Sequence, residues 1–237
     1  MPFHAKSFTW SVTLGLLFWA TVGARAARAD TIRLTFEGLG QTGRFPCAER
    51  IADFYNGGFG GGPCGAPGHG PGPDLGIVFS RTSLALIDAD AGGNGNFGGE
   101  PSPNTVMFFN PTGPAVMNVA RGFSGSLGVF YSSGSSTGAL RVFAGFNGTG
   151  ALLGNLFLPP TPVNGAPDPT GIFSPLVAVQ LPFKGLAHSA AFDGPANGIV
   201  FDDVTTNVGA PTPEPGSLWL ISMALLGLGR RFVAIGR

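Results

Sequence analysis

The stretch Gly138–Leu158 reads GALRVFAGFNGTGALLGNLFL, and its pattern of apolar residues decides the fold. Apolar side chains alternate over residues 140–146, the dipeptide Asn147-Gly148 follows, and a second apolar run occupies residues 152–158. An Asn-Gly pair between two such runs is a strong signal for a tight turn that joins antiparallel strands. The stretch therefore predicts a β-hairpin.

The central part of the chain repeats this pattern of short apolar runs separated by turn residues. Glycine occurs 40 times and proline 21 times, yet 43% of the residues are hydrophobic and 21 are phenylalanine, which argues against disorder. Runs that recur about every ten residues, without an amphipathic helix among them, predict an all-β protein with an antiparallel β-sandwich. The expected strands cover residues 31–36, 76–80, 83–87, 105–109, 115–119, 126–132, 140–146, 152–158, 176–181, 187–192 and 198–204.

The first 29 residues have the organisation of a secretory signal peptide. Lys6 precedes an apolar stretch at residues 12–22, and Ala-Arg-Ala at residues 27–29 is a small-x-small cleavage site. We expect the Sec translocon to export the chain and signal peptidase to cleave it after Ala29, with a cut after Ala26 as the alternative. The apolar stretch is short for a membrane span, which argues against an uncleaved anchor.

The distribution of charge excludes one class of partner. Seven basic and twelve acidic residues lie between residues 30 and 210, a net charge of about −5 for this part of the chain. Proteins that bind nucleic acids neutralise phosphates with clustered Lys and Arg. The sequence contains no such basic patch, so nucleic-acid binding is not expected.

The C-terminal segment is organised as a short membrane anchor. Pro213, Glu214 and Pro215 precede an apolar run at residues 217–228. A helix of 12 to 14 residues is about 18–21 Å long, against about 30 Å for the hydrocarbon core, so the span is short. Each proline keeps the preceding residue extended, which exposes the chain to a processing enzyme.

Arg230 and Arg231 follow the apolar run and form a cytoplasmic stop by the positive-inside rule. This order of Pro-Glu-Pro, apolar helix and arginines resembles the PEP-CTERM sorting signal of Gram-negative bacteria. The resemblance implies transient anchoring in the inner membrane, cleavage by an exosortase and release to the outer surface or extracellular matrix. It also implies an exopolysaccharide-producing, biofilm-forming cell. A plain C-terminal membrane anchor is the alternative.

The body of the chain resembles jelly-roll, galactose-binding-like domains. The turn VFAGFNGTG at residues 142–150 is similar to their paired strands, and GIVFDDV at residues 198–204 is similar to the last strand of many carbohydrate-binding modules. The resemblance implies a sandwich between an N-terminal signal helix and a short C-terminal hydrophobic helix. The expected organisation is a signal peptide at 1–29, a β-sandwich ectodomain at 30–206, a linker at 207–212 and a sorting segment at 213–237.

Cys47 and Cys64 are the only cysteines. Two cysteines in an exported protein usually form a disulfide, whereas a metal site would need more ligands than the nearby His69 offers. The predicted disulfide closes a loop of about 17 residues and stabilises a long Gly- and Pro-rich segment at residues 38–76. A loop of that length is unusual unless it has a function.

Two sets of acidic residues are candidate calcium sites. Asp88, Asp90 and Asn94 lie close together in a glycine-rich loop, and oxygen ligands on a flexible loop suit Ca²⁺. A solvated turn is the alternative. The same loop contains the pattern Gly-x-Gly-x-x-Gly at residues 93–98, but Pro101 follows at once and no helix is expected there, so a nucleotide site is excluded.

The second set is Glu37, which directly follows the first expected strand, with Asp202 and Asp203 on the last expected strand. These strands lie side by side in a jelly roll, where a structural Ca²⁺ is common in the domains that it resembles. Since neighbouring strand residues face opposite ways, only one of the two aspartates is expected to face Glu37, and the other is expected in solvent.

Nothing in the sequence specifies a reaction. His69 and His188 belong to no metal motif, and no Gly-x-Ser-x-Gly elbow is present. We therefore expect a non-catalytic surface or matrix protein associated with exopolysaccharide. The candidates for aromatic contacts in a sugar-binding groove are Phe54, Tyr55, Phe59 and Phe97. The alternatives are a secreted glycoside hydrolase that uses two of the carboxylates, and a purely structural surface protein.

Overall fold

The computed structural model describes residues 30–42, 48–62, 67–109, 113–163 and 171–209. Within these ranges the protein is all-β and antiparallel, as expected. The predicted signal peptide, both cysteines and the predicted sorting segment lie outside the described residues. The described part has no helix that is long and apolar enough to cross a membrane.

The described ranges contain eleven strands, and three of them, β4, β5 and β8, have the predicted bounds. The hairpin predicted from Gly138–Leu158 is present as β7 and β8. Its turn lies where the sequence places it, because Thr149 N donates to Phe146 O at 3.1 Å and Asn147 and Gly148 both have positive φ. The strands are β1 (Asp30–Leu34), β2 (Glu49–Arg50), β3 (Ile77–Phe79), β4 (Ser83–Ile87), β5 (Thr105–Phe109), β6 (Ala115–Ser132), β7 (Gly138–Phe143), β8 (Leu152–Leu158), β9 (Val177–Pro182), β10 (Ala187–Asp193) and β11 (Val200–Val208).

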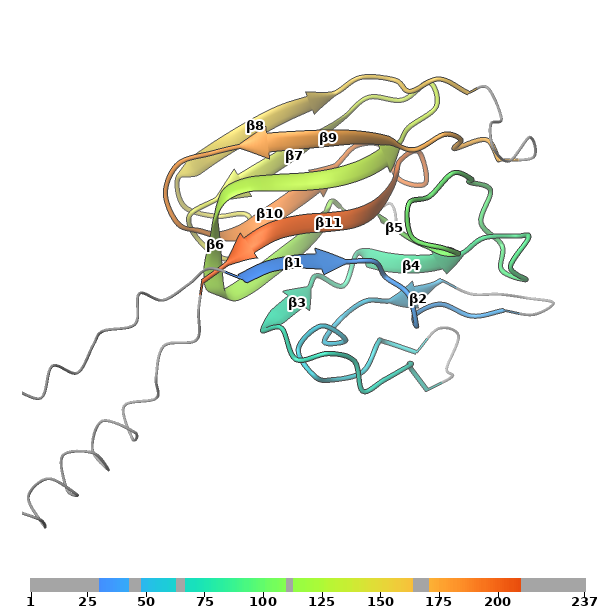
Figure 1. The fold of residues 1–237 in the computed structure, drawn as a ribbon, viewed down its shortest axis with the longest axis horizontal. Coiled ribbons are helices and arrows are strands. Elements are labelled where there is room, and N and C mark those ends of the chain that lie inside the picture. Colours follow the sequence, from blue (N-terminus) through green and yellow to red (C-terminus); the bar gives the residue numbers. More distant parts are fainter. Residues whose placement is uncertain (1–29, 43–47, 63–66, 110–112, 164–170, 210–237) are drawn as a thin grey trace, which may run out of the picture.

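Strand β6 belongs to both layers of the sandwich, which the sequence did not predict. Its first half pairs with β3 and β10, and its second half pairs with β9 and β11. The two strands expected at 115–119 and 126–132 are thus one strand that bends between the layers (Figure 1). Gly122 and Gly125 lie at this bend. Their φ values of 72° and 84° are adopted more easily by glycine than by other residues.

The two layers follow from these pairings. One contains β3, β6, β10, β7 and β8, and the other contains β9, β6, β11, β5, β4 and β2, with β1 beside the end of β11. Phe201 of β11 lies in the core between them. Its ring centroid is 6.4 Å from that of Phe109 in the same layer and 5.2 Å from that of Phe192 in the opposite layer. Phe201 therefore contacts aromatic side chains of both layers.

Both ends of the domain lie at the same corner of the sandwich (Figure 1). Asp30 at the start of β1 pairs with Val208 at the end of β11. Strand β11 also continues two residues beyond the expected domain end at residue 206, so the linker predicted at 207–212 begins no earlier than Gly209. The chain thus enters and leaves the domain at neighbouring points.

The long Gly- and Pro-rich segment is fixed by a buried carboxylate that the sequence analysis did not single out. Glu49 is fully buried, and its carboxylate accepts hydrogen bonds from Gly40 N at 2.8 Å and from His69 N at 2.6 Å. His69 Nδ1 lies 2.6 Å from the same carboxylate. Three distant parts of the segment are joined by this one side chain.

The position of Phe201 gives a test of the core. Phe201→Ala should lower the free energy of unfolding by about 3–5 kcal/mol, because it removes a fully buried ring from between the layers. Phe157→Ala is the matched control, because the Phe157 side chain is 62% exposed, and it should change stability by less than about 1 kcal/mol. Urea denaturation of both variants measures this, and equal losses would contradict the assigned core.

Candidate functional site

The loop after β4 folds back on itself through backbone hydrogen bonds. Ile87 O accepts from Asn94 N at 3.1 Å and from Gly95 N at 2.8 Å. A Cβ on Gly93 would lie 2.1 Å from Ile87 O, and a Cβ on Gly95 would lie 2.1 Å from the ring of Phe97. The glycines are therefore required by close backbone packing, and the described residues between them and β5 form no helix.

A second loop is joined to this one and completes a pocket. Asn96 Oδ1 accepts from Ile172 N at 3.0 Å, and Asn96 O accepts from Phe173 N at 3.1 Å. Below these contacts lies a small apolar cluster on the outer face of the sheet, separate from the main core. It is formed by Phe97, Val106, Leu176 and Val200, with Leu86, Phe108, Phe130 and Phe173 packed against it.

The pocket between these loops has a volume of about 350 Å³, and we call it the amide pocket. Its rim carries three exposed amide side chains, and its floor is formed by aromatic and aliphatic side chains, without a charged residue among those that line it. The lining residues are Ala48, Leu86, Asn94, Asn96, Phe97, Phe108, Phe173, Asn197 and Val200. Pockets for small ligands usually combine an apolar wall with a few such polar groups.

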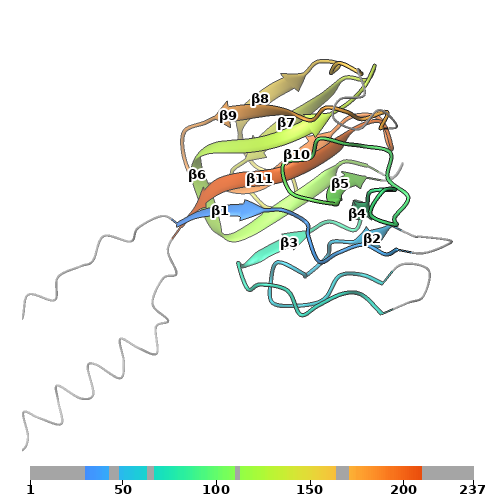
Figure 2. The same cartoon turned by 45° about the vertical axis from the view of Figure 1, so that its right-hand side comes forward.

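The amide pocket lies at the opposite end of the sandwich from the chain ends. Asn197 and Val200 stand before and at the start of β11, whereas Gly209 follows the end of this strand. Nine strand residues span about 30 Å. The rotated view shows the loop after β4 far from the corner where the chain enters (Figure 2).

The first predicted calcium set lies in the loop after β4. Asp88 is buried, and burial together with a hydrogen bond to the Asp90 carboxyl group raises its pKa to about 7. Two carboxyl groups that share a hydrogen bond must hold a proton between them. Asn94, the third predicted ligand, lies on the rim of the amide pocket.

In the second predicted set, all three carboxylates have protein partners. Glu37 accepts from Thr105 N at 2.9 Å, and Asp202 accepts from Ser102 Oγ at 2.8 Å. Asp203 forms an ion pair with Arg33, and the hydrogen bond between them raises the pKa of Arg33. Burial raises the pKa of Glu37, and it raises that of Asp202 to about 7.

The expectation that one of the two aspartates faces solvent is wrong. Asp202 is fully buried and Asp203 is 4% exposed, with Asp203 Oδ1 lacking a hydrogen-bond partner in the described part of the chain. The cause is a β-bulge, because the register of β11 on β6 shifts between Asp202 and Thr205 and the φ of Asp203 is 53°. A bulge breaks the alternation on which the expectation relied.

Sequence analysis did not single out Glu100, which lies near both acidic sets. Its charge raises the pKa of Glu37 and of Asp88. No three His, Cys, Asp or Glu side chains form a group that could hold a metal ion, as far as the structure describes the chain. Calcium at either set is still a prediction.

Of the four aromatic residues proposed for a sugar-binding groove, Phe97 lines the amide pocket but is fully buried, and Phe59 is exposed but is not among the lining residues. Phe54 and Tyr55 are buried in the main core, and Tyr55 Oη accepts a hydrogen bond from Phe36 N at 2.7 Å. They cannot stack on a sugar, so the expectation is wrong for these two residues. The accessible aromatic side chains of the amide pocket are Phe108 and Phe173, which sequence analysis missed because both lie in apolar runs typical of core strands.

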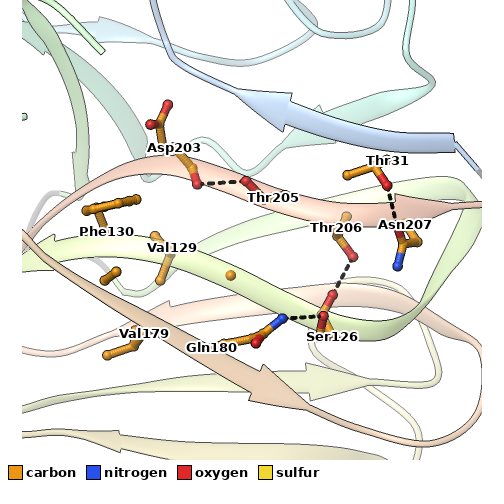
Figure 3. A pocket seen from close by; sticks show the side chains of 12 residues that line it. Thr31, Ser126, Val129, Phe130, Val179, Gln180, Asp203, Thr205, Thr206 and Asn207 are labelled. Atoms are coloured by element: carbon orange, nitrogen blue, oxygen red, sulfur yellow. Dashed lines mark hydrogen bonds between the residues drawn. The ribbon is translucent and has the colours of Figure 1, made fainter. Parts of the chain in front are cut away.

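A second hollow crosses the outer face of β1, β11, β6 and β9, and we call it the hydroxyl groove (Figure 3). Thr31 Oγ1 donates to Asn207 Oδ1 at 2.7 Å, and Gln180 Nε2 donates to Ser126 Oγ at 2.9 Å. Several of the hydrogen-bonding side chains that line the groove are therefore already bonded to one another. Its lining residues are Thr31, Ser126, Gly128, Val129, Phe130, Ala178, Val179, Gln180, Asp203, Thr205, Thr206 and Asn207.

Comparison with known proteins identifies one segment of the chain. Residues 211–231 match the PEP-CTERM protein-sorting motif, as the sequence analysis predicted. This motif implies an exported, cell-surface protein that is processed by exosortase. No curated protein matches the chain.

Three solved structures have similar folds at low sequence identity. The K2 cleaved adhesin domain of Lys-gingipain has a TM-score of 0.41 and 10% identity, over 76% of this chain and 98% of that one. The xylanase 10B modules from Clostridium thermocellum, complexed with xylohexaose, have a TM-score of 0.34 and 10% identity, over 58% and 27%. A family 29 carbohydrate binding module from Piromyces equi has a TM-score of 0.31 and 12% identity, over 56% and 92%.

The two cysteines lie outside the described residues, so the predicted disulfide between them needs a test in solution. Arg50 N donates to Gly61 O at 3.1 Å, and His69 N donates to the Glu49 carboxylate. These hydrogen bonds join the residues that follow Cys47 to the residues before and after Cys64. Replacing Cys47 and Cys64 by serine should lower the free energy of unfolding by about 3 kcal/mol. Free thiols in the exported wild-type protein, measured by alkylation and mass, would contradict the bridge.

The burial of Asp202 predicts a dependence of stability on pH. The folded state keeps a proton up to about pH 7, whereas an unfolded aspartate loses it near pH 3.9. The free energy of unfolding should therefore fall from pH 4 to pH 7, by at most about 1.4 kcal/mol per pH unit from this residue. Asp202→Asn cannot ionise and should show a shallower fall.

Denaturation in urea at several pH values measures this slope. Asp88 contributes in the same direction in every variant, so a fall should persist in Asp202→Asn but be smaller. The exposed Asp74 gives a control, because Asp74→Asn should keep the wild-type slope. Identical slopes in wild type and Asp202→Asn would show that Asp202 is ionised in the folded protein.

Proposed function

We propose that this protein is a non-catalytic component of the cell surface or extracellular matrix that associates with exopolysaccharide. The observation that carries the proposal is the PEP-CTERM sorting motif at residues 211–231, which lies behind a compact β-sandwich. The proposed setting is the outer surface of a Gram-negative, biofilm-forming bacterium, after transient anchoring in the inner membrane.

The geometry of the domain supports a role in presentation. Because Asp30 and Val208 are paired, the sorting segment leaves the domain at the same corner where the chain enters it. A domain held at this corner presents the opposite end, with the loop after β4 and the amide pocket, to its surroundings. A binding protein needs its ligand site away from its attachment, and this arrangement provides it.

The buried acids support a non-catalytic role. Raised pKa values are typical of general acids, and both Asp88 and Asp202 have them. A catalytic acid must reach its substrate, but both side chains are buried, and Asp202 is bonded to Ser102 through its side chain and backbone. We therefore assign these carboxyl groups a structural role rather than that of a glycoside hydrolase.

The sorting segment gives the first test, in the native host. The exported protein should begin at Asp30 and end near Pro213–Pro215, as measured by intact mass of the surface fraction. Replacing Glu214 and Pro215 by alanine should leave the tail uncleaved and the protein in the membrane fraction. Arg237→Ala lies outside the matched motif and serves as the control, which should be processed normally.

A wild-type protein that retains residues up to Arg237 would contradict sorting and leave a plain membrane anchor. The calcium content of the same sample tests the calcium prediction. Release of reducing ends from the host exopolysaccharide by the purified protein would contradict the non-catalytic role and favour a hydrolase.

A further inference from the structure

We propose that the amide pocket is the sugar-binding site of this protein, and that it accepts a ring of a neutral polysaccharide and rejects polymers of uronic acids. This inference rests on the proposed function and assigns it to particular residues. The pocket combines an aromatic floor, an amide rim and a surrounding negative charge, and each of these selects for one property of the ligand.

The floor selects a flat apolar face. Phe108 and Phe173 are half-buried, and each packs on the apolar cluster beneath the pocket while part of its ring is accessible. A sugar ring has faces formed by C–H groups, and such a face packs on an aromatic ring with the gain expected for apolar contact. The buried cluster holds both rings in place, so little conformational entropy is lost on binding.

The rim selects hydroxyl groups. Asn94 and Asn197 are exposed, and their side chains have no hydrogen bond within the part of the protein that the structure describes. Each amide offers two donor hydrogens and an acceptor oxygen, which suits sugar hydroxyls because these both donate and accept. Asn96 is bonded to Ile172 and instead fixes the second loop.

The charge around the pocket selects against anions. No Lys or Arg is among the described residues that line it, whereas Asp90 and Glu100 lie in the loop that forms one side, and Asp88 shares a hydrogen bond with Asp90. A carboxylate on a uronic acid would meet this negative charge and find no cation to pair with among the described lining residues. A neutral sugar meets no such repulsion.

The size of the pocket limits the contact to a short part of the polymer. A volume of about 350 Å³ is near the lower end for small-ligand pockets, about 300–1,000 Å³. We expect one or two rings to be bound. The hydroxyl groove is the less suitable site, because its polar groups bond to one another and it contains the charged Asp203.

Affinity electrophoresis of the full exported protein tests the assignment. The probes are three neutral polymers (galactomannan, xylan and dextran), two uronic polymers (polygalacturonate and alginate) and the host exopolysaccharide. The wild type should be retarded by at least one neutral polymer and by neither uronic polymer. Asn94→Ala and Phe173→Ala should each weaken that binding about tenfold or more.

Two further variants separate binding from folding. Asn197→Gly removes an amide and keeps the left-handed backbone, because φ is 55° at this position, so it should fold normally and bind more weakly. Asn155→Ala removes an exposed amide from β8, outside the pocket, and should bind as the wild type does. Thermal denaturation confirms that each variant is folded.

The outcomes test the site assignment and the proposed function separately. If the wild type binds a polymer and the folded pocket variants bind it equally well, the site assignment is wrong and the proposed function stands. If it binds uronic polymers instead of neutral ones, the selection by charge is wrong. If it binds no polymer, the host exopolysaccharide included, both the site and the proposed function are wrong.

Discussion

The burial of strand β11 is the constraint on which the rest of the structure depends. It pairs with β6 along one edge and with β1 and β5 along the other, so its backbone groups are satisfied on both sides. Phe201 joins the two layers, and Val200 belongs to the apolar cluster beneath the amide pocket. Core, chain ends and candidate site therefore share one strand, and a change in its register would disturb all three.

Much of the fold was predictable because alternation is a local property of the chain. The runs that became β4, β5 and β8 are bounded by turn residues, and so their ends were found as well. The continuity of β6 was not predictable, because Gly122 and Gly125 are typical of a turn as well as of a bend within a strand. The PEP-CTERM segment was identified because its three elements occur in a fixed order.

The candidate site was harder to predict, because it depends on contacts between distant segments. Asn94, Asn197 and Phe173 are brought together only by the folded loops, and nothing in their spacing indicates this. The bulge at Asp203 likewise depends on pairing with β6, so the burial of both aspartates could not be read from alternation. An available signal was the loop at residues 93–98, which contains two asparagines and Phe97.

The placement of the chain end and the pocket at opposite ends of β11 has a mechanical consequence. A pull on the residues after Gly209, resisted by a ligand at Asn197 and Val200, acts along the axis of this strand. Its hydrogen bonds to β6 and β1 would then be loaded together in shear, rather than broken one after another as in peeling from an edge. Such a domain should resist flow and traction better than its equilibrium stability alone implies.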